Sequence, residues 1–412
     1  MLMPVEDAQK IILQQIRPLG RLVSKPLQEA ADHLLGEDAR ADGDIPPFTN
    51  TAMDGFAVRT EDVASASPEN PVTLRIVGVI RAGHPGSMPI KPGECYKIMT
   101  GAPVPDSADA VVPVEWTQPG TLQDRVDILR AVNPGASLRW RGEDMQVGQV
   151  VVARGTTITA PVLGMLATIG YAEVPVAAPP KVAILSTGDE LREPGVPLTP
   201  GTIRNSNTYA LYAAIQQAGG EPVIYPSAPD DPDAIRKLFT QAASECDLLV
   251  SSGGVSVGDF DFVKPVIESL GHLTLWRVNL KPGKPLAFGD VLGKPIIGLP
   301  GNPVSALVTF ELFVRPVIRT LLGDTRWERP VLSLPLFTAF NAVEDRRQYV
   351  RCRLMVQEGQ LMLWPHDNQG SAVQTSWQDV DALMIVPENT GPYRAGDWLE
   401  ALVMGVDHIW RP

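Results

Sequence analysis

The chain has 412 residues, and its 35 basic and 47 acidic residues leave a net charge of −12. A composition that is 44% hydrophobic and 20% charged can bury substantial cores, which excludes a disordered protein and predicts roughly two to four domains. The acidic balance argues against a general nucleic-acid binder, which needs a basic face, but not against a small anionic ligand. The 39 prolines and 36 glycines indicate many turns and short loops.

The cysteines and the hydropathy pattern bear on the cellular compartment. Cys95, Cys246 and Cys352 form no CxxC motif and no disulfide framework, so we expect buried thiols in a reducing environment. The N-terminal segment carries early acids and has no apolar core of a signal peptide. The sequence contains no run of about 18 uncharged apolar residues, the length needed to span a membrane. We therefore expect a cytoplasmic protein without a membrane partner.

The first 170 residues are expected to contain a β-rich stretch with a helix before it and a helix after it. Apolar residues at helical spacing predict an amphipathic helix over residues 5–17. Short β-rich runs then alternate with Pro/Gly turns, which is typical of a small β-rich module. These runs are residues 73–79, 95–99, 110–114 and 125–129. A further helix is expected to begin after Thr159, as N-cap, and to end at Gly170.

Residues 181 to about 322 show a regular alternation of strands and helices. Strands are expected at 182–186, 222–225, 247–254, 274–278 and 295–299, and helices at 207–218, 232–244, 262–270 and 303–322. Short apolar strands between helices predict a parallel, doubly wound α/β sheet, with ligands at the carboxyl ends of the strands. Beyond Trp327 short strands and turns return.

This pattern divides the chain into parts. We expect a β-rich module over residues 46–145, an α/β domain over 181–326 and a C-terminal β-barrel-like domain over 327–412. Residues 1–45 and 146–180 form linker helices and a mixed domain, although the helix at 5–17 is also a candidate to pack on the α/β domain.

Acidic side chains follow three of the expected strands. Glu190 ends a Thr-Gly-Asp-Glu segment, where adjacent carboxylates could bind Mg²⁺ or simply lie in a solvated loop. Asp231 before Pro232 is explained as a helix N-cap. That role leaves the neighbouring Asp230 unexplained. The loop at 251–261 is rich in serine and glycine and ends with Asp261, which suits a phosphate or polyoxygen ligand.

Basic and helix-start segments follow the later strands. Lys281 and Lys284 alternate with prolines in a short loop, which we expect to hold their charges in position for a ligand. Pro300-Gly301-Asn302-Pro303 precedes a helix and leaves an open N-terminus. Because strand ends meet at one edge of a sheet, these features together predict a site for Mg²⁺ and a phosphorylated anion.

Three loops of the first β module carry acids but look locally like ordinary turns. They contain Asp54, Thr100 and Asp144. Arg139 and Arg141 beside Glu143 and Asp144 are most simply interpreted as a surface ion pair.

In this order the segments resemble the molybdopterin molybdenumtransferase family of molybdenum cofactor biosynthesis, which is related to the E domain of gephyrin. The matching motifs are PPFTNTAMDGFAV, IMTGAPVP, RGEDM, VAILSTGDEL, IRNSN, SSGGVSVGDFDFVK, KPGKP and GLPGNPVSALVTFE, spanning residues 46 to about 316. The C-terminal module matches loosely, through residues 345–348 and the stretch from Ser371 to Ser376. Phe56 stands where tyrosine is common in the family.

The resemblance implies a fold, an activity and partners. It implies an elongated homodimer of four-domain subunits, whose active site forms between the α/β domain of one subunit and the first β module of the other. The implied activity is Mg²⁺-dependent insertion of molybdate into adenylylated molybdopterin with release of AMP. A separate molybdopterin adenylyltransferase would deliver the substrate.

The resemblance also implies roles for individual residues. Catalytic roles fall to Asp54, Thr100, Asp144, Glu190 and Asp261, and metal binding to Glu190, Asp230 and Asp261. Substrate-binding roles fall to Ser252, Gly253, Gly254, Ser256, Lys281, Lys284, Pro300, Pro303, Ser305, Arg347 and Ser376. This chemistry is consistent with cleavage of a phosphoanhydride at a metal and with recognition of a tetrahedral dianion by lysine, serine and helix N–H donors.

Two other functions fit part of the pattern. One is a molybdopterin adenylyltransferase of the same superfamily, against which the flanking β modules argue. The other is a non-catalytic, gephyrin-like scaffold, against which the intact set of acids argues. Molybdate and tungstate are nearly isosteric, and the sequence does not discriminate between them.

Overall fold

The computed structural model describes residues 2–84, 89–254, 262–341 and 343–405. The chain forms two compact units, which are described separately: a larger unit of Met1–Val23 with Pro175–Pro412, and a smaller unit of Ser24–Val174. Among the described residues, none of the helices combines the length and apolar character needed to cross a bilayer. Ser256 and Asp261, both predicted site residues, lie outside the described residues.

The centre of the larger unit is a six-stranded sheet with the order β16-β13-β17-β21-β20-β18. Its strands are β13 (Lys181–Ser186), β16 (Glu221–Ile224), β17 (Leu248–Ser252), β18 (Leu273–Trp276), β20 (Ala287–Val291) and β21 (Lys294–Leu299). The first four strands of the order are parallel, whereas β20 and β18 are antiparallel to their neighbours. The prediction of a wholly parallel sheet is therefore wrong at this edge.

The antiparallel edge arises from a hairpin that was not predicted from the sequence. Val291 pairs with Lys294, so only Leu292 and Gly293 connect β20 to β21. Both residues have positive φ, 50° and 78°, as the tight two-residue turns of hairpins require. Leucine is an unusual residue at such a position, and this hid the turn in the sequence.

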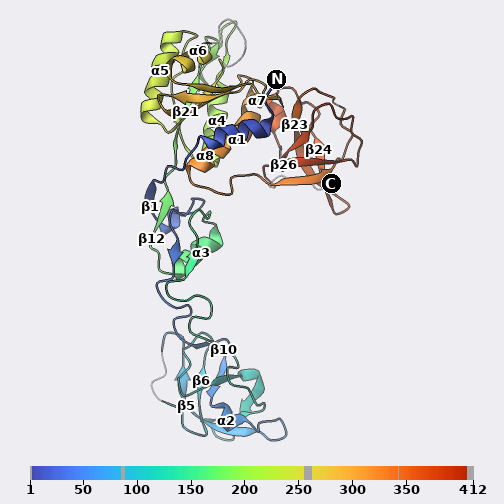
Figure 1. The fold of residues 1–412 in the computed structure, drawn as a ribbon. Helices are drawn as coiled ribbons and strands as arrows, with labels where there is room; N and C mark the ends of the chain where they lie inside the picture. The colour runs from blue at the N-terminus through green and yellow to red at the C-terminus, as the bar shows by residue number, and fades with distance from the viewer. Residues whose placement is uncertain (1, 85–88, 255–261, 342, 406–412) are drawn as a thin grey trace. The chain divides into compact units, whose positions relative to one another are not determined.

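Helices cover both faces of this sheet, as predicted for a doubly wound domain. They are α4 (Ser206–Gln217), α5 (Pro232–Glu245), α6 (Val263–Leu270), α7 (Pro303–Thr309) and α8 (Arg315–Leu321). Along β13, Val182 and Ile184 pack in one core with α4 and α8, while Ala183 and Leu185 pack in another with α5 and α6. This alternation is the two-residue period of a strand buried on both sides, and Figure 1 shows the two helical layers.

The N-terminal helix α1 (Val5–Gln14) joins the α/β domain. Its buried residues Val5, Ala8 and Ile12 belong to the same core as α4 and α8. The helix ends three residues earlier than predicted, because Pro18 disfavours helical backbone just before it.

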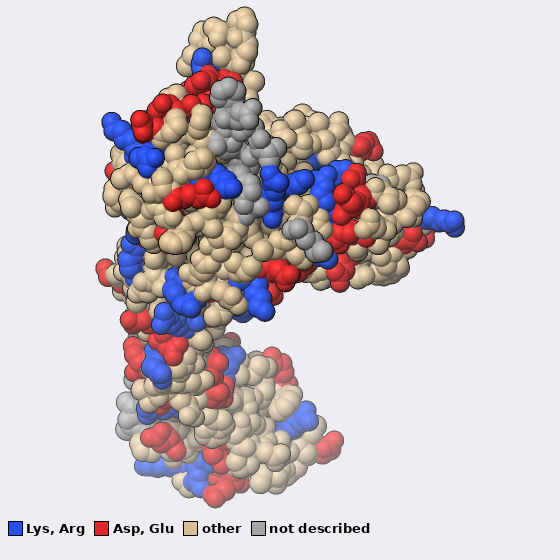
Figure 2. Space-filling model, turned by 45° about the horizontal axis from the view of Figure 1, so that its top comes forward, with Lys and Arg blue, Asp and Glu red and all other residues tan. Residues whose placement is uncertain are grey.

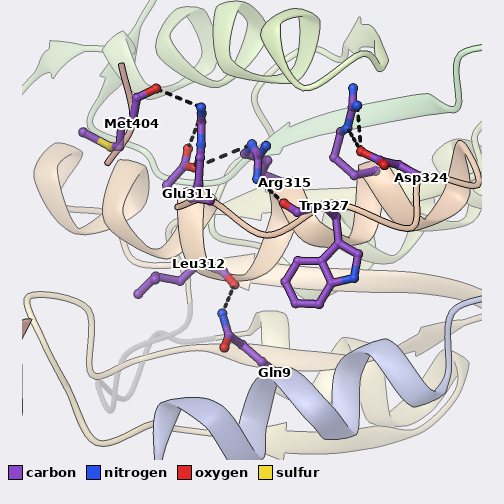
Figure 3. A network of polar contacts seen from close by, with 9 residues as sticks. Gln9, Glu311, Leu312, Arg315, Asp324, Trp327 and Met404 are labelled. Atoms are coloured by element: carbon purple, nitrogen blue, oxygen red, sulfur yellow. Dashed lines mark hydrogen bonds and ion pairs between the residues drawn. The ribbon is translucent and has the colours of Figure 1, made fainter. Parts of the chain in front are cut away.

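The helix expected over residues 303–322 is interrupted by a π turn, η3 (Phe310–Val314), between α7 and α8. Pro316 has no N–H to donate to the Leu312 carbonyl four residues earlier, so the α-helical ladder cannot continue there. The side chain of Gln9 from α1 donates to that carbonyl instead, at 2.8 Å (Figure 3).

The C-terminal domain of the larger unit is a second mixed sheet with the order β19-β23-β25-β26-β22, in which β24 pairs with β23. Its strands are β19 (Leu280–Lys281), β22 (Val331–Pro335), β23 (Arg347–Gln357), β24 (Gln360–Pro365), β25 (Ala382–Val386) and β26 (Trp398–Val403). A bridge between Leu336 and Leu363 brings the end of β22 back to β24. Strand β19 pairs with β23 and so links the lysine loop to this domain.

The smaller unit contains the expected β-rich module, a sheet of order β7-β4-β6-β5-β9-β8. Its strands are β4 (Gly55–Val58), β5 (Val72–Ile80), β6 (Glu94–Ile98), β7 (Ala110–Pro113), β8 (Thr117–Pro119) and β9 (Arg125–Ile128). The expected helix is α3 (Ala160–Thr168), although the side chain of Thr159 makes no capping hydrogen bond. Shorter elements across the two units are β1 (Leu22–Pro26), β2 (Ala39–Arg40), β3 (Asn50–Thr51), α2 (Thr60–Val63), β10 (Leu138–Arg139), β11 (Val150–Val152), β12 (Glu173–Ala177), β14 (Leu191–Arg192) and β15 (Ile203–Arg204).

Candidate functional site

A cavity of about 1130 Å³ lies within the larger unit, where the strand-end loops of the α/β domain meet the C-terminal domain. Its α/β lining comes from residues 187–188, Glu190, Ile203, Asp230, 253–254, 281–285, 300–302 and Ser305. The C-terminal domain contributes residues 340–341, 346, 348–350, 367 and 369–371. The cavity thus lies at the predicted edge of the sheet, and its volume suits an organic ligand rather than an inorganic ion alone.

The acids predicted at the strand ends line this cavity together. Glu190 and Asp230 are both lining residues, and the backbone N–H of Asp230 donates to Asp189 Oδ1 at 3.3 Å. The absence of a side chain at Gly188 leaves room for the Glu190 carboxylate, because a Cβ there would clash with Glu190 Oε2. Asp231 caps α5 by accepting from the Ala234 N–H at 2.8 Å. The prediction of Asp231 as an N-cap is confirmed, and Asp230 lies at the cavity without a capping role.

The acidic edge offers oxygen donors of the kind that Mg²⁺ prefers. Thr187 at the same edge has a buried hydroxyl without a hydrogen-bond partner in the described structure. Across the described residues, the structure contains no cluster of three or more His, Cys, Asp or Glu suited to a metal. Mg²⁺ commonly uses one or two carboxylates and keeps several waters, so Glu190, Asp230 and the unpaired hydroxyl fit that ion.

The glycine-rich loop contributes backbone rather than serine side chains to the described part of the cavity. Gly253 and Gly254 line the cavity with φ of 91° and 66°, and a Cβ on Gly254 would clash with Val263 Cγ2. The Ser252 hydroxyl instead accepts from Asn207 Nδ2 at 2.8 Å, and that amide also donates to the Gly301 carbonyl. Asn207 therefore ties two strand-end loops together, a role that its IRNSN motif did not reveal.

Cations line the cavity together with these acids. Lys281, Lys284 and Arg346 are all lining residues. Lys281 forms an ion pair with Glu344 of the C-terminal domain, and Arg346 Nη1 approaches the Leu280 carbonyl at 3.5 Å. In the described part of the chain Lys284 has no charged partner. On the face drawn in Figure 2, basic and acidic side chains are interspersed.

The N-terminus of α7 is partly occupied rather than open as predicted. Pro300 and Ser305 line the cavity, whereas Pro303, the first residue of α7, does not; Ser305 is 3% exposed. The Val304 N–H donates to the Ser371 carbonyl at 3.1 Å, and Asn302 Nδ2 donates to the Ser371 hydroxyl at 3.1 Å. The C-terminal domain therefore satisfies one of the helix's first N–H groups, which sequence alone could not show.

The structure does not bring Arg347 or Ser376 to the cavity lining. Arg347 pairs with Glu6 of α1 and lies 3.8 Å from Glu388 Oε2. Its neighbours Arg346 and Gln348 line the cavity instead. Ser376 is fully buried, and its hydroxyl donates to the Val373 carbonyl at 2.5 Å.

A buried cation, Arg351, lies behind the cavity wall and was not predicted from the sequence. Arg351 is 0% exposed, and its Nη2 donates to the carbonyls of Asn368 and Gly370 at 3.0 and 3.3 Å. Its Nε and Nη1 have no hydrogen-bond partner among the described residues. Burial lowers the pKa of Arg351 to about 10, so the group stays charged at neutral pH. The available signal was an arginine within the apolar run of β23.

The predicted residues of the smaller unit include one well-defined pair. Asp54 Oδ1 accepts from the Thr100 hydroxyl at 2.6 Å and from the Thr100 N–H at 2.7 Å. These two bonds hold the pKa of Asp54 below its ordinary value. Asp144 is exposed, and its N–H donates to the Ile45 carbonyl at 3.0 Å.

The ion pair expected between the arginines and acids of residues 139–144 is wrong in its partner. Arg141 Nε donates to Asp44 Oδ2 at 2.7 Å, while Glu143 accepts from the Trp140 N–H at 2.7 Å. The hydrogen bonds to Asp44 from the Val147 N–H and from Arg141 lower the pKa of that carboxyl. The arginine pairs with an acid distant in sequence, because a β-bridge between residues 45 and 145 brings the two segments together.

Known protein families match almost the whole chain. The MoeA N-terminal region (domain I and II) matches residues 3–170, a probable molybdopterin binding domain matches residues 183–320, and the MoeA C-terminal region (domain IV) matches residues 333–404. The central match coincides with the sheet whose strand ends form the cavity.

Full-length relatives extend this similarity. A molybdopterin molybdenumtransferase 2 from Mycobacterium tuberculosis is 37% identical over 403 residues, covering 96% of this chain and 98% of the relative. A molybdopterin molybdenumtransferase from Bacillus subtilis is 35% identical, covering 97% and 94%. The crystal structure of a molybdopterin biosynthesis MoeA protein from Pyrococcus horikoshii superposes with a TM-score of 0.86 at 28% identity, covering 98% of this chain and 100% of that one. The chain therefore belongs to the molybdopterin molybdenumtransferase family.

Proposed function

We propose that this protein inserts molybdate into adenylylated molybdopterin with the help of Mg²⁺ and releases AMP. The observation that carries the proposal is the cavity itself, which is lined both by the carboxylates of Glu190 and Asp230 and by the cations of Lys281, Lys284 and Arg346. A substrate that combines a phosphoanhydride with a tetrahedral oxyanion requires both kinds of group. Family membership supports molybdopterin as the organic partner.

The carboxylates would serve the phosphoanhydride. Glu190 and Asp230 would hold Mg²⁺, with Asp261 as the third ligand that the family motif suggests. When bound, the ion would neutralise charge that develops on the phosphate oxygens as AMP leaves. The open backbone of Gly253 and Gly254 lets a phosphate approach closely, because neither residue carries a side chain.

The cations would bind the oxyanion. Lys284 and Arg346 present charge to the cavity, and Ser305 lies at the first turn of α7, where helix N–H groups favour anions. Arg351 adds a desolvated positive charge behind the 367–371 segment. Its two nitrogens without a described partner make it a stronger candidate for oxyanion recognition than Arg347, whose charge is already shared with two glutamates.

We further propose a homodimer in which Asp54, Thr100 and Asp144 complete the site of the partner subunit, and a separate adenylyltransferase that supplies the substrate. The resemblance to the family motivates both. The Asp54–Thr100 pair supports the first, because two hydrogen bonds hold an exposed carboxylate in its ionised form.

Incubation of the purified protein with adenylylated molybdopterin, molybdate and Mg²⁺ tests the proposal. We expect AMP in the supernatant and a product that activates a cofactor-free molybdenum enzyme. Formation of adenylylated product from molybdopterin and ATP would favour the adenylyltransferase alternative. Absence of AMP and of active cofactor would leave only a scaffold role. Replacing molybdate by tungstate in the same assay measures the metal preference.

A further inference from the structure

One helical segment, residues 302–321, makes polar contacts with the C-terminal domain at two separate places. The first is at the cavity, where Asn302 and Val304 bond to Ser371. The second is two turns further along, at Glu311 in the π turn. A segment held at both places fixes the distance between the strand ends and the opposite cavity wall.

The second contact is a three-part connection (Figure 3). Glu311 Oε1 accepts from Arg329 Nε at 2.6 Å. Arg329 Nη1 then donates to the carbonyl of Met404, just beyond β26, at 2.8 Å. We call Glu311, Arg329 and the Met404 carbonyl the joint. The Glu311 side chain is only 11% exposed, so its bonds compete little with water.

Neighbouring groups hold the joint in place from the α/β side. Arg315 Nε lies 3.6 Å from Glu311 Oε1, and Arg315 Nη1 donates to the Trp327 carbonyl at 2.6 Å. Burial lowers the pKa of Arg315 to about 10. Glu311 therefore balances two partly buried guanidinium groups. Gln9 fixes the π turn itself through the Leu312 carbonyl.

We propose that Glu311 and Arg329 are positioning residues that hold the C-terminal domain at the spacing the oxyanion site needs. The inference rests on the proposed function, because its kinetic test measures how well the site binds the oxyanion. If the joint opens, we expect Arg346 and the 367–371 segment to move relative to Ser305, while the β19–β23 pairing keeps the lysine loop with Arg346. Neither joint residue lines the cavity, so the effect passes through domain position alone.

Arg329→Lys is the most informative variant. It keeps the positive charge but replaces a forked guanidinium by a single ammonium, which cannot bridge Glu311 and the Met404 carbonyl together. Glu311→Gln is the second variant, which retains a similar shape and removes the negative charge. Asp324→Asn is the matched control: it disturbs the Arg319–Asp324 pair, 2.7 Å apart, which connects the same helix only to its own linker.

Domain position can be measured without any substrate. The native cysteines are buried, so spin labels on Lys237→Cys in α5 and Gln360→Cys in β24, both exposed sites, report the distance between the two domains. We expect a narrow distance distribution in the parent protein and in Asp324→Asn, and a broadened or displaced one in Arg329→Lys and Glu311→Gln.

The kinetic readout is the molybdate concentration that gives half-maximal cofactor formation. We expect it to rise about tenfold or more in both joint variants, with kcat at saturating molybdate nearly unchanged, because small displacements of binding groups weaken ligand positioning. Unchanged distances in both joint variants, or an equal change in Asp324→Asn, would overturn the inference. If the parent protein forms no cofactor, the proposed function fails, while the distance measurement still decides whether the joint sets domain position.

Discussion

The two walls of the cavity are built in different ways. Glu190 and Asp230 stand at the ends of adjacent parallel strands, and each is placed by its own loop within a few residues of a strand. On the opposite wall, Arg346, Ser371 and the buried Arg351 belong to a separate domain and are placed by contacts between segments far apart in sequence. The acids are thus placed locally by the sheet, whereas the cations come from both domains: Lys281 and Lys284 stand in an α/β loop, and Arg346 and Arg351 are placed by domain packing.

This difference has a consequence for charge. Glu190 and Asp230 have no cationic partner at the cavity in the described structure, whereas Lys281 of the α/β lysine loop is already paired with Glu344 of the C-terminal domain. The cations therefore differ in how far their charge is already paired. Lys284 and Arg351, which have no carboxylate partner among the described residues, carry more weight among them than the sequence motif suggests. The following variants test that ranking.

Replacing the buried guanidinium should have the largest effect. We expect Arg351→Met to lower cofactor formation by about 100-fold or more, the scale for losing a preorganised charge at a developing anion. Stability should be kept or raised, because an apolar side chain removes a buried unpaired charge. Arg353→Met on the same strand, where Arg353 pairs with Asp379 at 3.3 Å, is the control. Rates and melting temperatures measure both, and equal activity losses would refute the assignment.

The two lysines should differ from each other. Lys284→Met is expected to weaken molybdate binding by about tenfold, the scale of one charged hydrogen bond. Lys281→Met should cost less, because Glu344 already shares its charge. Glu344→Gln should tighten binding by releasing Lys281. Titration of molybdate against cofactor formation gives all three values. A larger loss for Lys281 than for Lys284 would contradict the ranking.

The acids of the cavity can be disturbed through the backbone. Gly188→Ala places a methyl group against Glu190 Oε2, at a φ of 145°. We expect a severalfold higher Mg²⁺ requirement, because Glu190 must move, with molybdate affinity unchanged. Mg²⁺ titration of AMP release measures this. The matched control is Gly195→Ala, also at positive φ, where no described heavy atom lies within 4 Å of the new methyl group.

The smallest expected effect concerns the smaller unit. It tests whether this unit takes part in the reaction. Hydrogen bonds from Thr100 lower the pKa of Asp54, so Asp54 stays ionised to lower pH than an ordinary aspartate. Thr100→Val removes the hydroxyl bond and should raise that pKa toward its ordinary value. If ionised Asp54 is required, the acid limb of the activity profile then moves to higher pH. An acid limb that does not move would separate Asp54 from the reaction.

Much of this protein could be predicted from local patterns. Apolar runs in β13 and β17 predicted the buried sheet, and Asp231-Pro232 predicted the start of α5, because strand burial and helix capping depend on neighbours in sequence. The placement of Glu190, Asp230 and Lys284 around one cavity followed from the rule that parallel strands end at one edge.

Other features were decided only by tertiary structure. The hairpin at Leu292-Gly293, the capture of the α7 N-terminus by Ser371 and the inward turn of Arg351 depend on partners distant in the chain. Arg347 shows the reason most clearly. Its motif predicted a role at the cavity. In the structure its neighbours Arg346 and Gln348 line the cavity, and Arg347 forms an ion pair with Glu6 of the N-terminal helix. The sequence by itself determined which groups stand at the strand ends, whereas domain packing determined which cations are free to meet an anion.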